Sequence, residues 1–253
     1  MSSIGELLAN DQDNLLAIAR DLPHFTRIVP RIDALYDQSL GLLRVGDHLA
    51  LFYGQSLLLC HKALLCAALT IGRRHPDDAA AITRRAIEAV STARAVKYDP
   101  GNLERWRAYE KRLARWNARN AGERPSPFHP EITYPAEDRL LDEIRRFLGT
   151  LSDSFVHFTP EFFEGRGWKT ERQGDAGQLA MPYMEVDQRV IERELITLGG
   201  IHVRILDLFD ECFDGAFVAD VPWRERRVEL IAIGDQIAEH YFKAPEPEPQ
   251  LGE

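Results

Sequence analysis

The chain has 253 residues, 45% of them hydrophobic and 28% charged, a composition typical of a soluble globular protein. Its 31 basic and 40 acidic residues give a net charge of -9, which excludes a molecule that coats nucleic acid over its whole surface. Cys60, Cys66 and Cys212 form no Cys-x-x-Cys pair, so a disulfide framework and a zinc ribbon are excluded and buried free thiols are expected. The first residues lack both the basic and the apolar region of a signal peptide, which predicts a cytoplasmic protein.

Apolar residues at helical spacing predict the first elements of the chain. We expect helices over residues 4–20 and 31–45, with a break between them that Pro23 and Pro30 bracket. The next helix, over residues 48–72, is about as long as a membrane span. Four polar residues interrupt it, so we interpret it as a buried core helix and expect no membrane association.

Capping residues predict the next boundaries. Asp47 can cap the core helix, and Asn102 can cap a helix over residues 103–120. Between these two helices, a helix over residues 76–98 begins with a proline and two aspartates and stops at an Asp-Pro-Gly turn. Residues 73–124 hold 13 basic and 7 acidic side chains, which leaves 18 basic and 33 acidic for the rest of the chain. The middle of the chain is therefore locally basic.

Helices and loops alternate in the second half. Four prolines predict a loop over residues 121–135, and four glycines predict a long loop, with room for a small hairpin, over residues 165–183. Further helices are expected at residues 136–157, 160–164, 184–213 and 222–242.

These elements predict an all-α fold, a single bundle of about seven to nine helices with a long glycine-containing loop. We expect residues 1–243 to form one helical domain. Residues 244–253 are acidic and rich in proline, so we expect a disordered tail there.

Two histidines lie on apolar helix faces. His61 and His202 occupy the two most hydrophobic helices, which suggests a shared buried polar spot. Such a spot is either a ligand pocket or a place where core histidines satisfy their hydrogen bonds. Gly199 and Gly200 precede His202, and they either let another backbone approach closely or leave room for a ligand.

His157 differs, because it lies opposite the apolar stripe of its own helix. One interpretation is a polar residue at a helix C-terminus, where an imidazolium interacts favourably with the helix dipole. The other is a pocket residue whose ring Asp153, four residues earlier, would orient.

We expect no metal site and no cofactor. The chain has no Glu-x-x-His of the kind that builds di-metal sites in helical bundles, and no His-Glu-x-x-His zinc pattern. It also lacks the Gly-x-Gly-x-x-Gly, P-loop and Gly-x-Ser-x-Gly motifs.

The helix over residues 103–120 interleaves Trp106, Tyr109 and Trp116 with arginines. Aromatic side chains among arginines can stack bases and hold phosphates. The same spacing is typical of an amphipathic helix whose aromatics face the core, so nucleic acid, an acidic partner surface and plain solvation all stay open. The candidate contact residues are Arg105, Arg107, Arg112, Arg115 and Arg119.

Arg84 and Glu88 lie one helical turn apart in the segment TRRAIEAVSTARAVKYDPGNLERWRAYEKR, and a Ser-x-x-x-His stretch follows in LSDSFVHFTP. Both segments resemble an uncharacterised bacterial all-α family. The resemblance implies that the polar positions of that family fall on Arg84, Glu88, Ser152 or Ser154, and His157. The family is loosely similar to HEPN helical domains, some of which are ribonucleases, but the Arg-to-His spacing of those ribonucleases is missing here.

The sequence therefore favours a cytoplasmic, non-enzymatic helical protein that binds a partner through its basic helix and its 165–183 loop. The expected partner is another protein or a second copy of the chain, and nucleic acid is less favoured. The alternative is a HEPN-like, metal-independent nuclease or other hydrolase. There His157 would act as general acid or base, and Arg84, beside Glu88, would stabilise phosphate charge.

Overall fold

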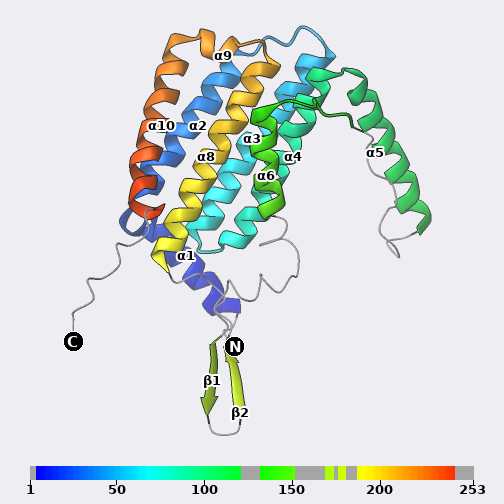
Figure 1. Cartoon of the computed structure of the whole chain (residues 1–253). Coiled ribbons are helices and arrows are strands. Elements are labelled where there is room, and N and C mark those ends of the chain that lie inside the picture. Colours follow the sequence, from blue (N-terminus) through cyan, green and yellow to red (C-terminus); the bar gives the residue numbers. More distant parts are fainter. Residues whose placement is uncertain (1–3, 121–131, 152–168, 174–175, 181–186, 243–253) are drawn as a thin grey trace, which may run out of the picture.

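The computed structural model describes residues 4–120, 132–151, 169–173, 176–180 and 187–242 (Figure 1). The fold is an all-α multi-helix bundle, as predicted. Its described helices are α1 (Ile4–Asp21), α2 (Pro23–Leu42), α3 (His48–Gly72), α4 (Pro76–Tyr98), α5 (Gly101–Asn120), α6 (Arg139–Leu151), α8 (Gln188–Cys212), α9 (Ala216–Ala219) and α10 (Val221–Phe242). Strands β1 (Lys169–Gln173) and β2 (Ala176–Ala180) pair antiparallel, so the predicted glycine-rich loop does contain a hairpin.

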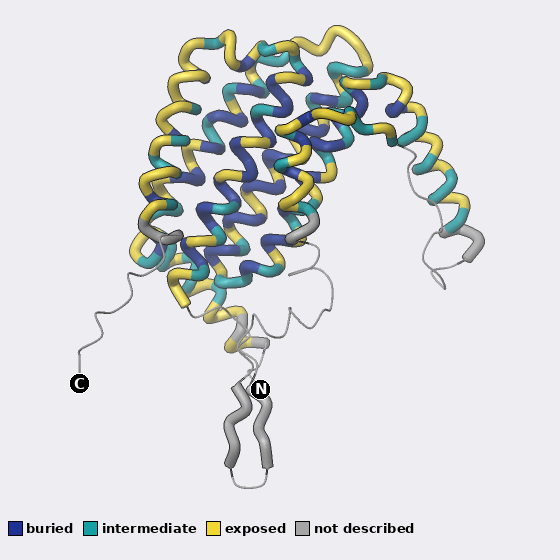
Figure 2. The backbone as a smooth tube through the Cα atoms, viewed as in Figure 1, coloured by how far each residue is buried: buried dark blue, intermediate teal, exposed yellow. Residues whose placement is uncertain are grey.

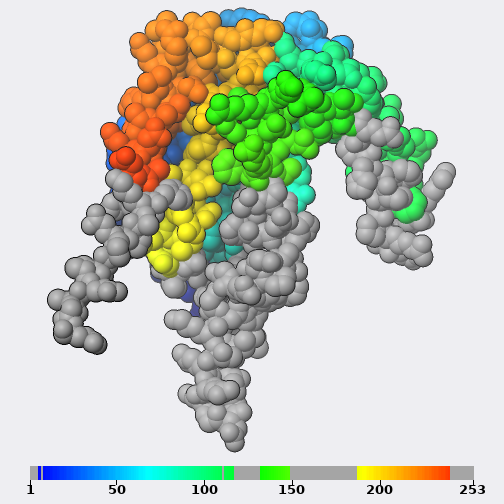
Figure 3. Space-filling model, in the orientation of Figure 1, coloured from blue at the N-terminus to red at the C-terminus, as the bar shows by residue number. Residues whose placement is uncertain are grey.

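Helices α2, α3, α4 and α8 form the centre of the bundle, and most of the buried residues lie on them (Figure 2). α8 packs against α2, α3 and α4, while α3 and α4 form a tightly packed helical pair. α10 packs against α2 and α8, and α6 packs against α4 and α8. The space-filling view shows α10 and α6 on either side of α8 (Figure 3). α5 touches mainly α4 and extends away from the bundle (Figure 1). Most of the core therefore lies on α2, α3, α4 and α8, and α5 contributes to it only near its start, through Leu103.

α3 begins and ends where the sequence predicts. A carboxylate oxygen of Asp47 accepts hydrogen bonds from the backbone N–H groups of Leu49 (2.9 Å) and Ala50 (2.8 Å), which satisfies two donors of the first turn. After Gly72 a short turn leads into α4, which starts at Pro76. The missing N–H of a proline is harmless at the start of a helix, so this residue favours the boundary.

The predicted break between residues 20 and 31 is present but far shorter than expected, because it is confined to Leu22. α2 begins at Pro23, as the first residue of the helix, and continues through Pro30. A proline inside a helix removes one backbone hydrogen bond and costs about 3 kcal/mol. Ile28, Val29 and Ile32 around it are all buried in the core, and this packing outweighs the local preference.

Asn102 does not cap α5. The side chain of Asp99 accepts from the N–H of Gly101 instead (2.9 Å), and α5 starts there. Asn102 is fully buried, donates to the carbonyls of Ala95 and Thr133 (2.8 Å each), and accepts from the N–H of Thr133 (2.9 Å). Through these hydrogen bonds, Asn102 connects the segment before α6, at Thr133, to the end of α4, at Ala95.

Between α8 and α10 the structure has a short helix that the sequence analysis missed. Gly215 adopts a left-handed backbone conformation (φ +79°), which suits glycine, and turns the chain into α9. One carboxylate oxygen of Asp210 accepts from the N–H groups of Phe217 (2.7 Å) and Val218 (3.1 Å). α10 then begins within one residue of the predicted start.

Two buried polar pairs join α2 to its neighbours. The indole N–H of Trp223 on α10 donates to the hydroxyl of Ser39 (2.9 Å), which itself donates to the carbonyl of Leu35 (2.8 Å). One turn earlier on α2, the hydroxyl of Tyr36 lies 2.9 Å from Nδ1 of His202 on α8. All four side chains are fully buried, so the bundle centre is fixed by hydrogen bonds as well as by apolar packing.

Candidate functional site

A cleft with a volume of about 840 Å³ opens between α3, α4, α5 and α6. Its wall is made by Phe52, Gln55, Ser56 and Leu59 of α3, by Arg84, Arg85, Glu88, Ala89, Ser91 and Thr92 of α4, by Trp106 and Tyr109 of α5, and by Ile132, Tyr134, Arg145 and Leu148. We call it the α3–α5 cleft. It exists because α5 leaves the bundle at an angle and the Asn102 hydrogen bonds hold residues 132–134 beside it.

Aromatic side chains form one side of the α3–α5 cleft. The ring centres of Phe52 and Trp106 lie 5.8 Å apart, so the second turn of α5 packs against α3 at this point. The guanidinium of Arg145 lies 4.2 Å from the centre of the Tyr134 ring, within the range of a cation–π contact. Burial raises the pKa of the Tyr134 hydroxyl, and the nearby Arg145 charge partly offsets this. The cleft therefore presents ring faces beside positive charge.

Two of the predicted site residues, Arg84 and Glu88, line this cleft. Arg84 donates to the Glu88 carboxylate at 2.8 Å, one helical turn away, and both side chains are partly exposed. Such a pair stabilises a helix by only a few tenths of a kcal/mol. Arg85 and Arg145 have no carboxylate partner among the described residues, so the cleft as described carries an excess of positive charge.

The other predicted catalytic residue cannot be placed with them. His157 lies outside the described residues, as do Asp153, Ser152 and Ser154. The convergence of Arg84, Glu88 and His157, which the hydrolase hypothesis requires, therefore stays a prediction. The predicted helix at residues 160–164 and the tail at residues 244–253 also lie outside the described residues.

The arginines of α5 are mostly engaged locally. Arg105 makes two hydrogen bonds to the Asp99 carboxylate (2.8 and 2.7 Å), and Arg107 pairs with Glu104 at 2.7 Å. Arg115 is exposed and donates to a backbone carbonyl one turn earlier, Arg112 is half-buried, and the side chain of Arg119 is not described. The predicted contact role of these residues remains open, but Arg105 also stabilises the start of its own helix.

A row of leucines covers the solvent-facing side of α3. The side chains on this face are exposed by 39–56%, and we call them the leucine row: Leu51, Leu58, Leu59, Leu65 and Leu69. Leu51, Leu58 and Leu65 are seven residues apart, so they lie in line along the helix. Leu59 also lines the α3–α5 cleft, which makes the row and the cleft one continuous surface.

The leucine row corrects part of the sequence interpretation. α3 is long and apolar enough to cross a membrane, and half of its apolar stretch is buried in the bundle. The interpretation as a wholly buried helix was therefore too simple. Cys66 is exposed on this same face, contrary to the expectation of three buried thiols, whereas Cys60 and Cys212 are buried.

The predicted polar spot of His61 and His202 is organised by a residue that the sequence analysis missed, Tyr36. The rings of Tyr36 and His61 stack in parallel with centres 5.0 Å apart, and Tyr36 reaches His202 with its hydroxyl. On its other side, Nε2 of His61 lies 2.6 Å from the carboxylate of Asp33. Tyr36 sits on the apolar stripe of α2, where an aromatic residue is usually a plain core residue, so no sequence signal singled it out.

The end of this polar spot that holds His202 and Tyr36 is closed to solvent. Burial lowers the pKa of His202 to about 3, with a smaller contribution from His61, and burial raises the pKa of Tyr36 well above its usual range. Nε2 of His202 is buried and has no hydrogen-bond partner among the described residues. Both groups are held neutral, which suits a structural role better than proton transfer near neutral pH.

The outer end of the spot has the donors that a metal would need. Ligand atoms of Asp33, Asp37 and His61 lie within 4.8 Å of one another. Two carboxylates and an imidazole would suit zinc or another divalent transition metal. The hydrogen bond between His61 and Asp33 already accounts for the positions of two of these three residues. The expectation that the chain holds no metal stays a prediction.

Glu192 on α8 is the second buried titratable group that the sequence analysis missed. Its side chain is fully buried, and neither carboxylate oxygen makes a hydrogen bond of good geometry with a described residue. Burial raises its pKa to about 7, although the backbone N–H of His24 partly offsets this. A single glutamate in an apolar helix pattern gives no sequence sign of complete burial, because glutamates are usually exposed.

The substitution Glu192→Gln is expected to stabilise the protein at pH 8 by on the order of 2 kcal/mol. Because the folded state raises the pKa of Glu192, the protonated form stabilises the fold below about pH 4.5, and this contribution is lost as the pH rises through about 7. Glutamine removes the charge and keeps the shape. Urea unfolding at pH 5 and pH 8 measures the change in the free energy of unfolding. The control is Glu225→Gln, at an exposed position. An equal effect of both variants at pH 8 would contradict this account.

Comparison of the chain with protein-family models, curated proteins and solved structures finds no match.

Proposed function

We propose that this protein is a binding protein whose leucine row and α3–α5 cleft together take up an amphipathic, acidic helical segment of a partner protein. The observation that carries the proposal is the continuity of an exposed apolar row with a cleft whose Arg85 and Arg145 have no carboxylate partner in the described part of the chain. An exposed apolar patch rimmed by charge is typical of a protein–protein interaction site.

The dimensions of the row favour a helix as the bound segment. From Leu51 to Leu69 the row runs 18 residues, or about 27 Å along α3. Leucines at seven-residue intervals present the knobs that pack between the side chains of a second helix. The other exposed positions along the row are Gln55, Lys62 and Cys66, so the row carries little charge of its own.

The charge of the cleft favours acidic residues on that segment. Arg85 and Arg145 lack carboxylate partners among the described residues, and Glu88 is occupied by Arg84. Opposite charges across an interface steer association and penalise wrong partners. Nucleic acid would use the same arginines but would leave five leucines unburied, so it fits this surface less well.

A synthetic helix of about 18 residues, with leucines on one face and glutamates on the other, tests the proposal on the whole chain. We expect it to bind about tenfold more tightly than the same peptide with lysines in place of the glutamates. Leu58→Asp with Leu65→Asp is expected to weaken binding by about 2 kcal/mol or more, because the apolar contacts at the centre of the row are lost. Fluorescence anisotropy of the labelled peptide measures both effects.

Variants elsewhere supply the controls. Val228→Asp changes an apolar residue of α10 that is 59% exposed and should leave the affinity unchanged. Arg85→Ala with Arg145→Ala should lower the affinity and flatten its dependence on salt. The proposal fails if the lysine peptide binds equally well, or if only an RNA oligonucleotide, phospholipid vesicles or a second copy of the chain occupies the row. RNA cleavage that Glu88→Gln abolishes would favour the hydrolase instead.

A further inference from the structure

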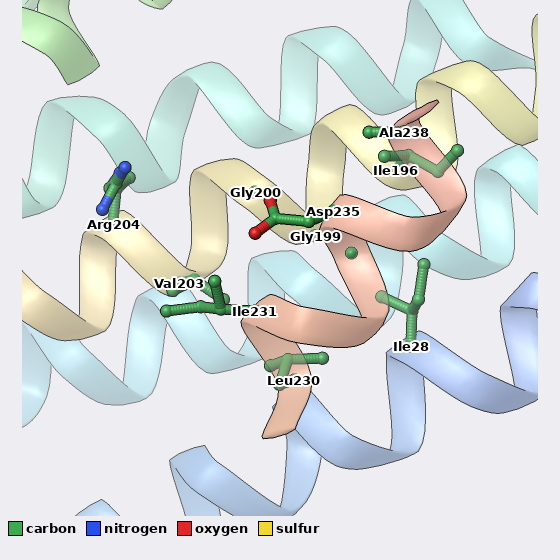
Figure 4. Close-up of a pocket in the computed structure, with 11 residues that line it drawn as sticks. Ile28, Ile196, Gly199, Gly200, Val203, Arg204, Leu230, Ile231, Asp235 and Ala238 are labelled. Carbon is green, nitrogen blue, oxygen red and sulfur yellow. The ribbon is translucent and has the colours of Figure 1, made fainter. Parts of the chain in front are cut away.

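A second cavity, of about 230 Å³, lies between α2, α8 and α10, away from the leucine row (Figure 4). Its walls are apolar, from Ile28 on α2, Ile196 and Val203 on α8, and Leu230, Ile231 and Ala238 on α10. Gly199, Gly200 and Gly234 line it without side chains, and the polar residues at its edge are Arg204 and Asp235. We call it the α8–α10 cavity.

The three glycines of this cavity have different structural roles. A Cβ atom on Gly199 would lie 2.9 Å from Ile28, so this glycine allows α2 and α8 to pack closely. Cβ atoms on Gly200 or Gly234 would meet nothing within 4 Å. Glycine inside a helix costs about 1 kcal/mol relative to alanine, and here no contact within the described chain explains that cost. The two glycines do, however, keep the cavity open.

The two charged residues at the edge of the cavity differ in whether an opposite charge lies near them. Arg204 lies within ion-pair distance of two carboxylates, Glu143 (3.7 Å) and Asp207 (3.6 Å). Asp235 has no ion-pair or hydrogen-bond partner among the described residues, and Figure 4 shows it beside the glycine pair of α8. The uncompensated charge at this apolar cavity is therefore negative.

We propose that the α8–α10 cavity binds a small apolar amine, with its hydrocarbon or aromatic body against the glycines and its ammonium group on the Asp235 carboxylate. The size fits such a ligand, since an apolar cavity of about 150 Å³ is sufficient to bind benzene. An apolar pocket with a few polar groups at its edge, here Arg204 and the exposed Asp235, is the usual form of a small-molecule site. The ammonium would give Asp235 the partner that it lacks within the described chain.

Three probes that share one phenylethyl body test this site in the full-length protein: phenethylamine, 2-phenylethanol and 3-phenylpropionate. Isothermal titration calorimetry should show the amine binding about tenfold more tightly than the alcohol, and the carboxylate binding most weakly. Asp235→Asn should bring the amine to the level of the alcohol. Glu239→Gln, one turn further along α10 and not part of the cavity wall, should change nothing.

Substitutions that fill the cavity with a larger side chain test whether the probes bind there. Gly234→Leu should fold, because its Cβ enters open space and leucine favours helix, and it should abolish binding of all three probes. Gly41→Leu on α2, whose Cβ also meets nothing within 4 Å, is the matched control and should bind normally. Gly200→Ala gives a milder filling in case leucine perturbs the fold. Failure of the amine to bind at millimolar concentration, preference for the carboxylate, or binding unaffected by Gly234→Leu and Gly200→Ala would overturn the proposal.

Discussion

Lowering the pH from 7 to 4 is expected to reduce the free energy of unfolding by about 3 kcal/mol through His202 alone. The folded state lowers the pKa of His202 from 6.5 to about 3, because the ring is fully buried against Tyr36 and near His61. A group whose pKa falls on folding stabilises the native state above its unfolded pKa, and it loses that contribution as the pH falls. The loss should run from about pH 6.5 to about pH 3.

The double variant Tyr36→Phe with His202→Leu removes both partners of the hydrogen bond and should remove this acid sensitivity. Removing both partners avoids the 1–3 kcal/mol or so that one orphaned buried polar group would cost. Urea unfolding at pH 7 and pH 4 measures the change. Glu192 acts in the opposite direction below pH 7, so all proteins should carry Glu192→Gln. His48→Gln, at an exposed position, is the control, and an acid-induced loss that persists in the double variant would refute the role of His202.

Replacing Trp223 with alanine is expected to destabilise the protein by about 3–5 kcal/mol. Trp223 is among the largest fully buried side chains, packs at a tilt against the ring of Phe217 with ring centres 5.7 Å apart, and donates to Ser39 on α2. The substitution leaves a large cavity between α10, α9 and α2 and removes the only partner that Ser39 has on α10 among the described residues. The midpoint of thermal unfolding should fall by about 10 °C.

Circular dichroism at 222 nm follows this unfolding without relying on the fluorescence of the removed residue. Trp223→Phe should lose only about 1–2 kcal/mol, because the ring packing stays and one hydrogen bond is removed. Val228→Ala, on the same helix but 59% exposed, should change the stability by less than about 0.5 kcal/mol. Equal effects of Trp223→Ala and Val228→Ala would mean that α10 contributes little to the core.

Local chemistry made much of the fold predictable. The start of α3 followed from the cap at Asp47, and the start of α4 followed from the proline and the two aspartates of its first turn. Helical phase placed His61 and His202 on core-facing surfaces, and the structure brings them to the same tyrosine. Where the prediction of α2 failed, at Pro30, the decisive factor was burial of neighbouring residues, which the chain reveals only after its helices have packed.

The candidate site was less predictable, because it depends on angles between helices. Trp106 and Tyr109 were expected either in the core or on nucleic acid, but they line a cleft because α5 diverges from α4. The spacing of the leucine row looks the same in the sequence whether a neighbouring helix covers it or not. Asn102 suited a helix cap by type, and only the fold showed that the segment at Thr133 needed its hydrogen bonds.

Cys66 gives the leucine row a chemical character of its own. It is the exposed one of the three thiols and lies between Leu65 and Leu69, while burial raises the pKa of Cys60 and Cys212. A thiol-reactive dye therefore marks this face of the native molecule without any engineered residue. We expect air oxidation of this thiol to join two molecules through a disulfide, so air-aged samples should contain a larger species that freshly reduced samples lack.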